Sequence, residues 1–187
     1  MSFRPSRLSF ADFLAYEAMQ EARHEFVDGV VVDFVAGNLR HAAVVTNLVA
    51  AIRPLLHPPT IVVGSDAIVP TPRGARHADV VITGADPAAA EPVVAAPLAI
   101  VEVISVATAV IDLTQKVEEY TAIAGLQEYA IVDSRKRWVQ VVRREDRDWR
   151  YGVPQLSGTL ALRSLDIEID FETIYAGAGV TALGPSA

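Results

Sequence analysis

An apolar run with one carboxylate at its centre constrains this chain more than any other feature. Leu98 to Ser105 has the sequence Leu-Ala-Ile-Val-Glu-Val-Ile-Ser, which predicts a strand buried on both faces. An ionised Glu102 inside such a strand must be compensated by a metal ion, a lysine or a proton. A second acid, Asp79, lies in a similar run from Ala78 to Thr83. The sequence therefore raises the question of whether these two carboxylates meet.

The composition favours one globular domain. The chain has 187 residues, of which 51% are hydrophobic, and it carries a formal net charge of −7. We expect a single domain over residues 1–187, with a loose tail from about residue 176. The chain has no cysteine, which excludes disulfide scaffolds and thiolate chemistry. Because we find neither a signal peptide nor an apolar run long enough to cross a bilayer, we expect a soluble, cytoplasmic protein without membrane contact.

Periodicity and turn residues predict alternating strands and helices, and thus an α/β (α+β) fold with a central mixed sheet flanked by helices. A capping box from Ser9 to Asp12 opens an N-terminal helix to about Ala22, and Asp28-Gly29 marks a hairpin turn. The remaining predicted elements are a helix over 38–56, a strand over 61–69, a turn over 70–74, strands over 78–83 and 98–104, a helix over 109–124, and strands over 128–133, 138–143 and 149–153.

Four residues form a candidate constellation. If the strands of Asp79 and Glu102 are neighbours, both carboxylates can reach one ion, and two carboxylates with water suit Mg²⁺ or Mn²⁺. Lys116 flanks the apolar stripe of the next predicted helix, from which its ammonium can reach the acids. Glu25 shares a face of the predicted hairpin with Val27, and from there it can complete the cluster.

At these positions the sequence resembles the putative restriction endonuclease family of the PD-(D/E)XK nuclease superfamily. The resemblance extends over roughly residues 8 to 145, and no single motif in it is specific, whereas the ordered set is. The residues that carry it are Glu25-Phe26-Val27-Asp28-Gly29, His41, Ala78-Asp79-Val80, Val101-Glu102-Val103-Ile104-Ser105, Asp112, Lys116, Tyr120, Gly125, Glu128-Tyr129 and Asp133.

The resemblance implies a restriction-endonuclease-like core and hydrolysis of phosphodiester bonds in DNA with Mg²⁺ or Mn²⁺. Asp79 and Glu102 would be metal ligands and Lys116 the catalytic lysine, while Glu25 would support the ion or a water. His41 and Asp112 would be accessory residues, and a homodimer would suit the cutting of two strands. The chain departs from the family at Ala78, Val106 and Ala130, where the family has two prolines and a tryptophan; these changes affect local loop geometry and leave the acids in place.

Each residue also has a plainer interpretation. Asp79 and Glu102 could be structural acids paired with Arg76 or Lys116, and Lys116 could simply pair with Asp112 four residues earlier. Glu25 could be an exposed cross-strand residue, and His41 an ordinary helix-start residue. The competing hypothesis for the whole chain is a catalytically inactive dimeric interaction module that retains the nuclease fold, which the acidic net charge favours.

Overall fold

The computed structural model describes residues 7–88, 92–106 and 108–181. A six-stranded mixed sheet in the order β10-β9-β8-β7-β6-β3 forms the centre, with β7 and β8 parallel and the other pairs antiparallel. Its strands are β3 (Ile61–Gly64), β6 (Val80–Thr83), β7 (Pro97–Ile104), β8 (Glu128–Asp133), β9 (Val139–Glu145) and β10 (Asp148–Tyr151). The predicted α/β class, with a central mixed sheet and flanking helices, is confirmed.

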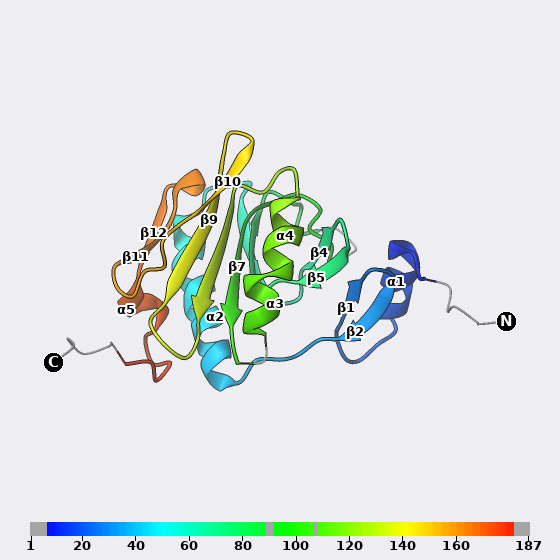
Figure 1. The fold of residues 1–187 in the computed structure, drawn as a ribbon, viewed down its shortest axis with the longest axis horizontal. Coiled ribbons are helices and arrows are strands. Elements are labelled where there is room, and N and C mark those ends of the chain that lie inside the picture. Colours follow the sequence, from blue (N-terminus) through cyan, green and yellow to red (C-terminus); the bar gives the residue numbers. More distant parts are fainter. Residues whose placement is uncertain (1–6, 89–91, 107, 182–187) are drawn as a thin grey trace.

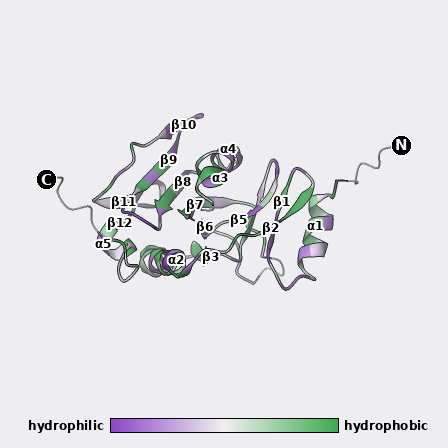
Figure 2. Ribbon diagram, turned by 60° about the horizontal axis from the view of Figure 1, so that its bottom comes forward, coloured by the Kyte–Doolittle hydropathy of each residue, from purple (hydrophilic) through white to green (hydrophobic). Residues whose placement is uncertain are grey.

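Helices cover both faces of the central sheet (Figures 1 and 2). One face packs on α2 (Leu39–Ile52), which continues into the 3₁₀ turn η1 (Arg53–Leu55), and the other face packs on α4 (Gln115–Thr121) behind the short α3 (Ala109–Leu113). Side chains of β7 alternate between the two faces, as the period of a strand requires. Val101 and Val103 belong to the core on the α2 side, whereas Ile100 and Ile104 belong to the core on the α4 side.

A second sheet, in the order β2-β1-β5-β4, lies at the N-terminal end of the molecule (Figure 1). It contains β1 (His24–Val27), β2 (Val30–Asp33), β4 (Ile68–Thr71) and β5 (Gly74–His77), and α1 (Phe10–Glu17) packs beside it. Asp28 and Gly29 both have positive φ, as expected for the predicted two-residue hairpin turn. At Gly74, with φ +151°, a Cβ atom would lie 1.9 Å from the carbonyl oxygen of Phe26, so β1 can pair with β5 only because this residue is glycine.

A two-stranded unit closes the core at the opposite end of the molecule. It consists of β11 (Thr159–Leu162), the 3₁₀ turn η2 (Arg163–Leu165) and β12 (Ile167–Asp170), and it is followed by α5 (Phe171–Ile174). Ala178 and Val180 are buried beyond α5. The loose tail expected from about residue 176 stays a prediction, and residues 182–187 lie outside the described part of the chain.

Several predicted boundaries are wrong, because tertiary context overrides local pattern. The N-terminal helix ends at Glu17 instead of Ala22, and the carboxylate of Glu17 accepts hydrogen bonds from the backbone and ring of His24 as the chain turns back. The helix predicted over 38–56 is an α-helix only from Leu39 to Ile52. The strand predicted over 61–69 is two strands of different sheets, and Pro70 of the predicted turn belongs to β4, where an edge position tolerates proline.

The helix predicted over 109–124 is interrupted at Thr114, whose φ and ψ of −128° and −80° separate α3 from α4. This break removes Leu113 from the predicted apolar stripe and leaves it 39% exposed, while Lys116 takes an inward position. Strands β5, β11 and β12 were not predicted. Among the residues that the structure describes, no helix is both long and apolar enough to cross a membrane.

Candidate active site

Glu102 faces α4, because it shares a face of β7 with Ile100 and Ile104. It is 2% exposed, and its Oε1 accepts hydrogen bonds from Lys116 Nζ at 2.9 Å and from the Tyr120 hydroxyl at 2.8 Å. Lys116 and Tyr120 are four residues apart on α4, so both side chains reach the same point on the sheet. The strand and the helix thus bring one acid, one ammonium and one phenol together in the core.

Asp79 lies immediately before β6, which pairs with β7 so that Val80 is opposite Val101. Continued by one residue beyond these pairs, the same antiparallel register would set Asp79 opposite Glu102. Its Oδ2 accepts hydrogen bonds from the backbone N–H of Val103 at 2.8 Å and from His41 Nε2 at 3.1 Å, with His41 protonated or in the tautomer that donates. His41 comes from the first turn of α2, so Asp79 is held between the two halves of the core.

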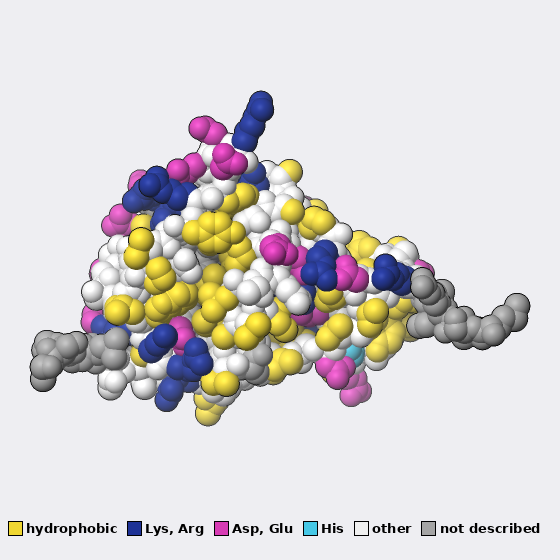
Figure 3. All heavy atoms as spheres, viewed as in Figure 1, with side chains coloured by type: hydrophobic (Ala, Val, Ile, Leu, Met, Phe, Trp, Pro, Cys, Tyr) yellow, Lys and Arg dark blue, Asp and Glu magenta, His cyan; other side chains and the backbone are white. Residues whose placement is uncertain are grey.

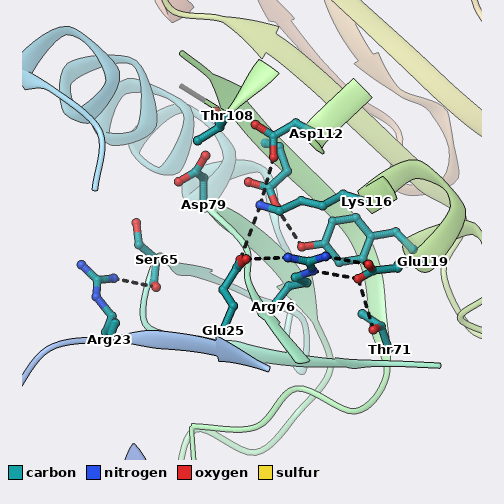
Figure 4. A network of polar contacts seen from close by, with 12 residues as sticks. Arg23, Glu25, Ser65, Thr71, Arg76, Asp79, Thr108, Asp112, Lys116 and Glu119 are labelled. Carbon is teal, nitrogen blue, oxygen red and sulfur yellow. Dashed lines mark hydrogen bonds and ion pairs between the residues drawn. The ribbon is translucent and has the colours of Figure 1, made fainter. Parts of the chain in front are cut away.

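Lys116 makes further ion pairs besides that with Glu102. Its Nζ is 3.0 Å from Asp112 Oδ1, one turn earlier in the chain, and 3.8 Å from Glu25 Oε1 of β1. Figure 4 shows Lys116 pointing between Glu25 and Asp112. The structure therefore brings Glu25, Glu102, Asp112 and Lys116 together, and the pairing of Lys116 with Asp112 is the one that the plainer interpretation anticipated.

Burial dominates the electrostatics of these acids. The pKa of Glu102 lies well above its ordinary value, because burial and the charges of Asp79 and Asp112 outweigh the opposing effect of Lys116. For Asp79, burial alone would raise the pKa, but the hydrogen bond and charge of His41 outweigh it and the pKa is lowered.

Neighbouring carboxylates favour the protonated forms of Lys116 and His41. Burial opposes the charge of Lys116, yet Glu102, Asp112 and Glu25 raise its pKa above the ordinary value. Burial likewise would lower the pKa of His41, but the hydrogen bond and the charge of Asp79 outweigh burial, and the pKa of His41 is raised. Lys116 is consequently an ammonium at neutral pH, able to donate hydrogen bonds and stabilise negative charge, and unable to accept a proton.

The donor set suits a hard cation better than zinc. Within the described residues, no group of three or more His, Cys, Asp or Glu side chains is arranged as a ligand set. Asp79 Oδ1 and Glu102 Oε2 each accept no hydrogen bond from the described residues, whose donors go to the other oxygen of each carboxylate. Two carboxylate oxygens with water completing the coordination fit Mg²⁺ or Mn²⁺.

The sequence does not indicate that two further residues, Arg76 and Glu119, link the members of this network. Arg76 donates to both Glu25 and Glu119, and Glu119 also accepts a hydrogen bond from the Thr71 hydroxyl (Figure 4). Glu119 could have been found from its position, because it follows Lys116 by three residues and so lies on the same side of a helix. Arg76 could not, since β5 lacks the apolar alternation that predicts a strand.

Comparisons with known proteins bear on the fold and the family. A solved structure of a putative nuclease belonging to DUF820 from Anabaena variabilis ATCC 29413 superposes with a TM-score of 0.67 at 12% sequence identity, over 90% of this chain and 97% of that one. This likeness shows a shared fold. No curated protein matched. A family model described as Uma2, putative restriction endonuclease, matches residues 10–172. The chain therefore belongs to the Uma2 family of putative restriction endonucleases.

Proposed function

We propose that this protein is a metal-dependent endonuclease that hydrolyses phosphodiester bonds in DNA. One observation carries the proposal: Lys116 Nζ lies 2.9 Å from Glu102 on β7, and Asp79, directly before the adjoining strand β6, accepts a hydrogen bond from the N–H of Val103, the residue after Glu102. A lysine beside two buried acids is costly for folding alone, since burial of ion pairs rarely stabilises a protein. The family description and the fold are consistent with a nuclease.

The residues divide the chemistry as follows. Asp79 and Glu102 would hold Mg²⁺ or Mn²⁺, which when bound polarises a phosphoryl oxygen and acidifies a water. His41 and the Val103 N–H fix one oxygen of Asp79 and leave the other for the ion. Tyr120 does the same for Glu102. Lys116 supplies a fixed positive charge to the phosphate as negative charge develops in the transition state.

Glu25 and Asp112 act on Lys116 in this proposal. Their carboxylates lie 3.8 and 3.0 Å from its Nζ, so they keep the ammonium charged and oriented in a buried site. The competing hypothesis, an inactive module, predicts that Lys116 points away from the acids or that an arginine fills the pocket. Lys116 contacts Glu102, which supports the enzyme, and the buried Arg76 pairs with Glu25 and Glu119 while Glu102 and Asp79 bind other partners.

The test is a cleavage assay on linear, supercoiled, single-stranded and branched DNA with Mg²⁺, Mn²⁺ or EDTA. The wild type should cleave at least one substrate with metal and none with EDTA, and Asp79→Asn and Glu102→Gln should lose cleavage and most of the heat of Mn²⁺ binding in calorimetry. Glu118→Gln, at an exposed acid of α4, is the matched control and should behave as wild type. Mn²⁺ binding that survives in both site variants would refute the ligand assignment.

We further propose that the protein acts as a homodimer through α3. Val106 and Val110 are 78% and 75% exposed, and Ile111 and Leu113 add two half-exposed aliphatic side chains. Figure 3 shows hydrophobic side chains across this part of the surface. Light scattering should give twice the monomer mass for the wild type and for Val153→Glu, a control on the β10 side, and the monomer mass for Val110→Glu. A monomeric wild type would refute the dimer.

A further inference from the structure

Arg76 is a buried cation for which the proposed chemistry has no use. It lies on β5 and is 3% exposed, which is rare for a guanidinium unless it is paired on several sides. Its Nε and Nη2 donate to the two oxygens of Glu119 at 2.8 and 2.6 Å, and its Nη1 donates to Glu25 Oε2 at 2.6 Å. Such a planar fork fixes direction as well as charge.

Both carboxylates that pair with Arg76, those of Glu25 and Glu119, are connected to Lys116. Glu25 presents one oxygen to Arg76 and the other, at 3.8 Å, to Lys116 Nζ. Glu119 lies three residues after Lys116 on α4, so the bidentate pair holds the helical turn that carries the lysine. Figure 4 shows the chain of contacts from Glu119 through Arg76 and Glu25 to Lys116.

We propose that Arg76 is a positioning residue that keeps the Lys116 ammonium on Glu102. This inference rests on the proposed function, in which the place of that ammonium matters. Lys116 has three carboxylates within 4 Å, those of Glu25, Glu102 and Asp112. Arg76 pairs with Glu25 at 2.6 Å and so partly neutralises its charge. Glu25 then attracts the Lys116 ammonium less than Glu102 and Asp112 do, and Lys116 stays 2.9 Å from Glu102.

Loss of Arg76 should therefore redirect Lys116. Without Arg76, Lys116 would be the nearest cation to Glu25 among the residues of this network. Because the lysine ammonium is compact and its side chain is flexible, it can move to the unpaired carboxylate of Glu25. Glu102 would lose its ion pair and become a stronger ligand for a cation. Catalysis should then fall while metal binding is kept or strengthened, whereas simple damage to the fold would weaken both.

The experiment compares Arg76→Gln and Arg76→Gln/Glu119→Gln with wild type and with Arg73→Gln. The double variant removes one charge of each sign, so it avoids leaving both buried carboxylates unpaired. Arg73 is the matched control, because it pairs with Asp28 and so joins the same two hairpins at an exposed position. For both Arg76 variants we expect kcat to fall by about 100-fold, as for a misplaced catalytic group, with KM within about twofold of wild type. The Mn²⁺ affinity should stay the same or increase.

A crystal structure of the double variant gives a readout that does not depend on activity. We expect Lys116 Nζ to lie closer to Glu25 than to Glu102. If Lys116 remains on Glu102, if kcat is unchanged, or if Mn²⁺ affinity falls together with kcat, Arg76 is structural only and the proposal is overturned. If the wild type cleaves no DNA, the proposed function fails, while the position of Lys116 in the double variant still decides the role of Arg76.

Discussion

His41 and Asp79, 38 residues apart in the sequence, are joined by a hydrogen bond of 3.1 Å between Nε2 and Oδ2, which is an ion pair when His41 is protonated. His41 enters from the first turn of α2, and Asp79 from the residue before β6. The pair therefore fastens the helix on one face of the sheet to a carboxylate that we propose as a metal ligand. Its strength must depend on pH, because both members titrate.

The pH dependence of this pair has a definite sign. The pKa of His41 is raised in the folded protein, so its contribution is present below the ordinary histidine pKa of about 6.5 and is lost as the pH rises through the raised value. The pKa of Asp79 is lowered, so its contribution is lost only as the pH falls through that lowered value. Both contributions are complete between pH about 4 and about 6.5.

We predict that His41→Gln lowers the free energy of unfolding by about 1 kcal/mol at pH 6 and by less at pH 9. Urea titrations with EDTA at both pH values measure this difference. His57→Gln, at an exposed histidine near the end of η1, is the control and should show no such change with pH. An equal loss for His41→Gln at pH 6 and pH 9 would show that the ion pair does not contribute.

For Glu102 we predict that the metal-free Glu102→Gln variant is as stable as the wild type, or more stable, at pH 8. The pKa of Glu102 is raised in the folded protein, so its ionisation costs stability as the pH rises above its ordinary value of 4.5. A glutamine removes that cost and still accepts the hydrogen bonds of Lys116 and Tyr120. Thermal unfolding in EDTA checks this, and a clear drop in Tm would identify Glu102 as a structural partner of Lys116.

For Lys116 we predict the opposite effect. Lys116→Met should destabilise the metal-free protein by about 3–5 kcal/mol, because Glu102 and Asp112 lose their shared cation in a buried site. Lys136→Met, at the exposed lysine between β8 and β9, should change stability by less than about 0.5 kcal/mol. Chemical denaturation of the three proteins at pH 8 compares them directly. A loss for Lys116→Met as small as that for Lys136→Met would contradict the buried network.

Gly74→Ala tests the join between β1 and β5. At φ +151° an alanine is strained, and its Cβ would collide with the carbonyl of Phe26, so we predict a loss of more than about 1 kcal/mol. Gly84→Ala is the control, since a Cβ at Gly84 meets nothing within 4 Å. Equal unfolding midpoints for the two variants in urea would show that the pairing of β1 with β5 tolerates a side chain at residue 74.

The sequence predicts the central strands well because their apolar runs are local. Leu98 to Ile104 and Glu128 to Asp133 are strands as expected, and the faces of β7 follow from alternation alone. Strand β5 could not be predicted, since Gly-Ala-Arg-His has no apolar pattern and is held by pairing with β1 and β4. The break at Thr114 also depends on tertiary packing, as the apolar positions on either side continue one helical period.

For the candidate site, some contacts could be anticipated from the sequence and others could not. Glu102 is recognisable in the sequence because it is the one acid in an apolar strand. Lys116, by contrast, has the spacing of a residue at the edge of a helix, yet in the structure it follows the break at Thr114 and is 6% exposed. The link from His41 to Asp79 joins residues distant in sequence, and no local pattern indicates it.

The segment from Gly74 to Thr83 belongs to both sheets, since β5 pairs with β1 and β6 pairs with β7. Arg76 and Asp79 therefore share one continuous stretch of backbone, in which only Ala78 and Asp79 link the two strands. A single-residue insertion or deletion that shifted the register of either strand would turn its side chains to the opposite face. We therefore expect a relative in which the spacing of Arg76 and Asp79 differs by one residue to lack the proposed site.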